Sequence, residues 1–146
     1  MSGPRVLVSR RDRSVRLSER RIRETVEHVL RREKSKASLS VAVVGNATMR
    51  RLHRDFMGID SPTDVLTFPL DAPGGFLGEV VACAGVARRE AASRGEKASD
   101  ELLLYVVHGV LHLLGYDDVA PRAFARMHRR EAALLAELGV AARVEA

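Results

Sequence analysis

The stretch LLLYVVHGVLHLLGY, residues 102–116, is the longest apolar run of the chain, and it contains two histidines, His108 and His112. It is too short to span a membrane, and its two imidazoles make a membrane location less favourable still, so it predicts a buried helix at the centre of the fold. Residues four apart lie on one face of a helix, about 6 Å from each other, so both rings can point at a common site. Burying two unsatisfied imidazoles costs several kcal/mol, so each ring needs a partner.

The segments around this helix predict a mixed fold. Short runs rich in valine and leucine, bounded by polar residues or glycine, predict strands at 5–10, 38–45, 65–70 and 75–83, the last two pairing as a hairpin. Apolar residues at helical spacing predict helices at 18–34, 47–58, 86–95, 99–115 and 121–139. Ser18 and Asn46 are the expected N-caps of the first two helices, Gly58 ends the second, and Pro121 and Gly139 bound the last.

The fold class that follows is α+β, with one small four-stranded sheet packed against about five helices and a single metal site on the central helix. The chain has 146 residues, the size of one domain, and no repeat or linker divides it. We therefore expect one domain over residues 1–146.

Composition bounds the location and the partners. The formal net charge is +5, mostly from arginine, which favours phosphate recognition and makes nucleic acid the first partner to consider, although a basic surface can also serve solubility alone. Cys83 is the single cysteine, so no intramolecular disulfide can form. The motif SRRDR, residues 9–13, is not followed by an apolar segment that would make it an export signal. These features predict a cytoplasmic protein that does not enter a membrane.

The histidine pair allows two interpretations. Each ring can be a core histidine bonded to a carbonyl, or the pair can bind a metal. Gly115 can end the helix in a left-handed conformation and bring Asp117 and Asp118 back towards the rings. Two nitrogens and one oxygen with a vacant position are typical of a catalytic zinc site, and also of non-haem iron. The residue after the first histidine is Gly109 instead of glutamate, which argues against an H-E-x-x-H protease.

Three blocks of the sequence resemble a known family. HGVLHLLGYDD, residues 108–118, resembles the signature H-G-x-L-H-L-x-G-Y-D-H of the YbeY family of bacterial metal-dependent endoribonucleases. LHRDFMGIDSPTDVLTFPLD, residues 52–71, and LGEVVAC, residues 77–83, resemble the blocks that precede it in that family. Order and spacing agree over about residues 40–118.

The resemblance implies a single-strand-specific, metal-dependent endoribonuclease acting in maturation of the small-subunit rRNA 3′ end and in ribosome quality control, with rRNA and the small subunit as partners. It also implies one Zn²⁺ per chain, bound by His108, His112 and Asp118, the last at the position of the family's third histidine. A carboxylate at that position adds a negative charge and favours harder ions such as manganese. The alternative is a non-catalytic RNA-binding assembly factor with a structural metal.

The same comparison suggests where substrate binds. The family often has an RNA-contacting arginine at the position of Met57, and Arg54, or Arg51, could take over that contact. Thr63 and Asp64 would lie near the metal cleft and orient ligands or substrate, although a turn alone explains both.

The catalytic residues themselves stay unassigned. Asp117 is a candidate general base, or a residue that hydrogen-bonds a ligand histidine, and we favour the second role. His128 could replace a ligand but is expected on the surface, as are His28 and His53, while Cys83 is expected in the core.

Overall fold

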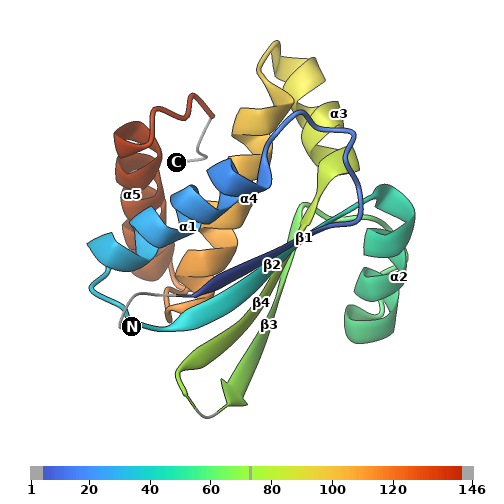
Figure 1. Ribbon diagram of the computed structural model, residues 1–146. Coiled ribbons are helices and arrows are strands. Elements are labelled where there is room, and N and C mark those ends of the chain that lie inside the picture. The colour runs from blue at the N-terminus through green and yellow to red at the C-terminus, as the bar shows by residue number, and fades with distance from the viewer. Residues whose placement is uncertain (1–4, 73, 143–146) are drawn as a thin grey trace.

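The computed structural model describes residues 5–72 and 74–142, and it has the mixed α+β architecture expected from the sequence (Figure 1). The elements in chain order are β1 (Val6–Arg10), α1 (Glu19–Arg32), β2 (Ser38–Val44), α2 (Asn46–Met57), β3 (Val65–Ala72), β4 (Phe76–Cys83), α3 (Ala84–Arg94), α4 (Ala98–Leu113) and α5 (Pro121–Glu137).

The sheet has the strand order β1-β2-β4-β3. The strands β1, β2 and β4 are parallel, with α1 as the crossover between β1 and β2. The expected hairpin of β3 and β4 is confirmed as an antiparallel pair in which Phe68 faces Glu79. The inner strands β2 and β4 end in runs of buried residues because both of their faces are covered, which explains their continuous valine-rich sequence.

The helices cover the sheet unequally: α1, α4 and α5 lie on one side, and α2 lies on the other (Figure 1). The helix α4 contacts β3, β4, α1, α3 and α5. Its buried positions therefore surround the helix axis, which confirms the expected central helix: Glu101, Leu102, Leu103, Tyr105, Val106, Val107, Gly109, Val110 and Leu111. Within the described residues, no helix is long and apolar enough to cross a membrane.

Most helix ends follow the sequence signals. Ser18 accepts a hydrogen bond from the backbone N–H of Arg21 at 3.0 Å, and Gly58 ends α2 in the left-handed conformation. The expected cap at Asn46 is wrong, because Gly45 holds the cap position and no side chain caps α2. Instead, the side-chain oxygen of Asn46 accepts a hydrogen bond from the Cys83 thiol at 3.3 Å, which ties the start of α2 to the end of β4.

Two histidines expected on the surface are at least partly buried. His53 is only 8% exposed, and its Nδ1 lies 2.8 Å from the carbonyl oxygen of Ser61, so it fixes the turn that leads into β3. His28 is partly buried against α5, where its Nε2 lies 2.7 Å from Glu137. Helical periodicity does not predict these contacts, because Ser61 lies in a turn and Glu137 is far from His28 in the sequence.

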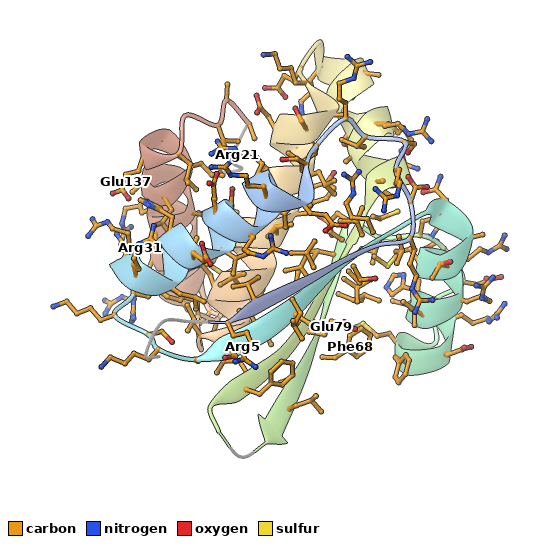
Figure 2. All side chains as sticks on the ribbon, viewed as in Figure 1. Arg5, Arg21, Arg31, Phe68, Glu79 and Glu137 are labelled. Atoms are coloured by element: carbon orange, nitrogen blue, oxygen red, sulfur yellow. The ribbon has the colours of Figure 1, made fainter. Side chains whose placement is uncertain are left out.

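Glu137 joins α1 to the end of α5 (Figure 2). Arg32 donates to both of its carboxylate oxygens, at 3.0 and 3.1 Å. The hydrogen bonds from Arg32 and His28 lower the pKa of Glu137 to about 2. Arg21 donates to the carbonyl oxygen of Leu138 at 2.7 Å, so α1 holds α5 at two points along its last turn.

Gly109 allows α4 to lie close to the sheet. A Cβ at this position would stand 2.6 Å from Cγ1 of Val80 and 3.2 Å from Cγ2 of Val65. Val80 is fully buried in the sheet and β-branched, so its side chain has little room to move. The glycine between the two histidines is therefore a packing requirement.

We predict that Gly109→Ala lowers the free energy of unfolding by about 1–3 kcal/mol, because the added methyl overpacks the contact with Val80. This is opposite to the gain of about 1 kcal/mol that Ala gives over Gly in an exposed helix. Chemical denaturation measures this change in the free energy of unfolding for Gly109→Ala, Val80→Ala and the double variant. In the Val80→Ala background the same substitution should cost much less; an unchanged cost would show that Val80 is not the obstacle.

Candidate metal centre

His108 and His112 lie side by side near the C-terminal end of α4. Their ring centroids are 4.7 Å apart, and the rings meet edge to face. Both side chains are about three-quarters buried, so the rings lie at the edge of the core with part of each accessible. The four-residue spacing therefore places them as the sequence predicts.

The chain then turns back to bring a carboxylate to the rings. Gly115 has a φ of +103°, and the N–H of Tyr116 donates to the carbonyl oxygen of Leu111 at 3.0 Å. After this turn an oxygen of Asp118 lies 3.4 Å from Nε2 of His112 and 3.9 Å from Nε2 of His108. The left-handed glycine and the approach of Asp118 are both confirmed.

These three donors fit a divalent ion. One donor atom from each of His108, His112 and Asp118 can be chosen so that all lie within 4.8 Å of one another. A tetrahedral zinc site with bonds of about 2.0–2.2 Å places its ligands roughly 3.3–3.6 Å apart. The distance of 3.4 Å from Asp118 to His112 lies in this range, and the distance of 3.9 Å to His108 is slightly longer. Two imidazoles and one carboxylate leave a position for substrate or water, so the arrangement suits a catalytic metal better than a closed structural one.

Glu131 holds the first histidine, a contact that no sequence pattern predicted. This carboxylate, on α5, is 2% exposed and accepts from Nδ1 of His108 at 2.6 Å. Burial alone would lower the pKa of His108, but the hydrogen bond and charge of Glu131 outweigh burial and raise it. A carboxylate on Nδ1 fixes the tautomer and leaves Nε2 free to bind an ion. The helical spacing could have revealed this carboxylate, because it places Glu131 on the same buried face of α5 as Met127, Leu134 and Leu135.

The loop that carries Asp118 is anchored to α1. The hydroxyl of Tyr116 donates to Glu33 at 2.8 Å, and Arg130 donates to the other oxygen of Glu33 at 2.5 Å. Asp117 accepts a hydrogen bond from the backbone N–H of Val119 at 2.9 Å and is outside the group of three donors, so the contact found for it is within the turn. These contacts fix the turn from which Asp118 reaches the histidines.

A cavity of about 420 Å³ adjoins His108. Its lining includes Thr63 and Asp64, which the resemblance placed near the metal. Asp64 also accepts a hydrogen bond from the N–H of Val65 at 2.7 Å, where the chain enters β3. The remaining lining residues are Pro62, Val65, Val86, Arg89, Glu90, Arg94, Glu101, Leu104, Tyr105, His108, His128 and Glu131.

The arginines of this cavity come from α3. Arg54 is exposed on α2 beside Asp55 and is not among the residues that line the cavity, and Met57 is 60% exposed on the same helix. Arg94 donates to Glu101 at 2.6 Å and to Glu96 at 2.9 Å, so these carboxylates occupy it. Arg89 lines the cavity with most of its side chain accessible.

His128 was expected on the surface, but the structure places it at the cavity. Its side chain is 13% exposed and lines the cavity, with its ring centroid 6.3 Å from that of His108. The prediction failed because the charged neighbours in RMHRRE suggested an exposed face, whereas this position of α5 faces α4.

Comparisons with known proteins agree with this geometry. A family model described as Endoribonuclease YbeY matches residues 7–139. A protein of that name from Alkalilimnicola ehrlichii is 47% identical over 111 residues, 72% of this chain and 67% of the relative. Another from Halorhodospira halophila is 40% identical over 127 residues, 82% of each chain. The solution structure of TM1509 from Thermotoga maritima is similar with a TM-score of 0.60 and 26% identity, covering 92% of this chain and 90% of that one.

We predict that Asp118→Asn loses at least about tenfold in zinc affinity, because an amide oxygen carries no charge for the ion. Asp117→Asn is the matched control and should bind zinc as the wild type does, while Asp118→His should restore binding through a third imidazole. Elemental analysis and competition with a chromophoric chelator measure the three variants. Equal loss in both Asn variants would contradict the assignment of Asp118.

We predict that Glu131→Gln lowers zinc affinity by about 10- to 100-fold, because the amide can still accept from His108 but no longer strengthens it as a ligand with a full negative charge. The same chelator competition measures the loss. Metal-free Tm should be recorded for both proteins, since a fall in Tm with unchanged zinc affinity would mean that Glu131 acts on the fold alone.

Proposed function

The chain belongs to the YbeY endoribonuclease family, and from this premise we propose that it is a metal-dependent endoribonuclease acting on single-stranded RNA. We propose that residues 1–146 form one catalytic domain that works in the cytoplasm, with rRNA of the small subunit as substrate and 3′-end maturation and ribosome quality control as its role. The observation that carries the activity is the convergence of three metal donors beside a cavity.

In this proposal His108, His112 and Asp118 bind one Zn²⁺ or another divalent ion. A bound ion supplies Lewis-acid stabilisation of charge on the phosphate and acidifies water near neutral pH. Glu131 holds His108 with Nε2 towards the ion, and the Glu33 network holds the turn of Asp118. We assign no side chain as general acid or base, and Asp117 serves the turn.

The cavity determines which RNA can reach the ion. A volume of about 420 Å³ is in the lower part of the range of ligand pockets, so it suits a few atoms of a flexible single strand better than the wider, stiffer duplex. We propose that Arg89 contacts a phosphate within the cavity, that Thr63 and Asp64 orient the strand, and that Arg54 contacts RNA outside it. With a net charge of +5, backbone contacts should make binding strongly salt-dependent.

We predict that zinc-loaded protein cleaves single-stranded RNA, that chelation abolishes cleavage, and that returning the ion restores it. Duplex RNA of the same sequence is the substrate control, and Asp118→Asn should cleave in proportion to its zinc content. Gel analysis of end-labelled strands measures cleavage, and fluorescence anisotropy measures binding. Three results together would instead identify a non-catalytic assembly factor. The protein would bind RNA equally well with and without the ion, it would not cleave the RNA, and its Tm would fall on chelation.

A further inference from the structure

Glu131 stands between two histidine rings. Its Oε2 accepts from Nδ1 of His108 at 2.6 Å, while its Oε1 faces Nδ1 of His128 at 4.0 Å. The second distance is too long for a hydrogen bond, but it places a buried negative charge directly beside that ring nitrogen. The proposed function gives His108 and Glu131 a role and leaves His128 without one.

The ring of His128 is held in a defined orientation. It lies against Phe124, with centroids 4.1 Å apart and ring planes 31° from parallel. Its Nδ1 is fully shielded and has no hydrogen-bond partner among the described residues. The 13% of the side chain that stays accessible therefore belongs to atoms other than Nδ1, and His128 lines the cavity.

The carboxylate determines which nitrogen carries the proton. A carboxylate only accepts, so the charge of Glu131 favours a proton on Nδ1 of His128, as it does on Nδ1 of His108. With the proton on Nδ1, the lone pair is on Nε2, the ring nitrogen that is not among the shielded polar atoms, and His128 lines the cavity. His128 is outside the group of three metal donors, so this lone pair suits a hydrogen-bond donor of the substrate.

A strand of RNA offers few donors of this kind near its backbone. Phosphate oxygens only accept, and the donors on the bases differ from base to base, whereas each ribose carries a 2′-hydroxyl beside the phosphodiester. DNA lacks this hydroxyl. We infer that His128 accepts a hydrogen bond from a ribose 2′-hydroxyl next to the cleaved phosphate and makes the cavity selective for RNA over DNA. This inference rests on the proposed function.

The test replaces each nucleotide of a single-stranded RNA substrate in turn by its 2′-deoxy form. With wild-type protein, one position next to the cleavage site should lower kcat/KM and weaken binding by about 10- to 100-fold. His128→Phe keeps an aromatic ring against Phe124 but has no acceptor. Its kcat/KM on the unmodified RNA should therefore be lower than that of the wild type by the same factor, and the 2′-deoxy substitution at that position should lower it no further. His128→Gln, which has an acceptor, should recover part of the selectivity.

His28→Phe, also a histidine beside a helix carboxylate but outside the cavity, is the matched control and should keep the wild-type pattern. Zinc content should be unchanged in all variants. An equal deoxy penalty in wild type and His128→Phe, or no penalty at any position, overturns the inference. If wild type binds these strands without cleaving them, the proposed function fails, while the Kd pattern still decides the role of His128.

Discussion

The close approach of α4 to the sheet at Gly109 is the constraint on which the site depends. With no side chain there, the helix lies directly on Val80 and Val65, and the rest of its surface is covered by α1, α3 and α5. His108, just before this glycine, and His112, three residues after it, then project from the edge of the core. A glutamate at 109, as in an H-E-x-x-H protease, would have to occupy the space of Val80, so the packing that fixes the ligands also excludes that general base.

Charged groups buried around α4 are held in pairs. Glu131 is satisfied by His108, and Glu101, which is also buried, is satisfied by Arg94. Removing one member of such a pair leaves a charge in the core, so each pair ties its helix to α4 in one arrangement. The first pair fixes α5 and the second fixes α3, and between them these helices form much of the cavity wall. The polar contacts that stabilise the packing therefore also shape the place where substrate is expected.

The sequence predicted features that depend on local signals. The apolar periodicity, the Ser18 cap, the left-handed Gly115 and the hairpin of β3 and β4 were all read from residues a few positions apart, and the structure confirms them. Contacts between residues far apart in the chain could not be predicted from such local signals. Glu131 meets His108 across 23 positions. Arg54 was chosen because it is near Met57 in sequence, and the structure places it outside the cavity on α2, which lies on the other side of the sheet from α4 and α5 (Figure 1).

The carboxylate at 118 changes the electrostatics of the site. Two neutral imidazoles and one carboxylate bring one negative charge to a divalent ion, where three imidazoles would bring none, so the ion attracts a phosphate less strongly. In the proposed function, positive charge for the phosphate then has to come from side chains of the cavity. Arg94 is occupied by Glu101 and Glu96, which leaves Arg89, whose nearest carboxylate is its neighbour Glu90 at 3.5 Å. In the proposed function, Arg89 on α3 is therefore the side chain of the cavity that can offer its charge to a phosphate of the RNA.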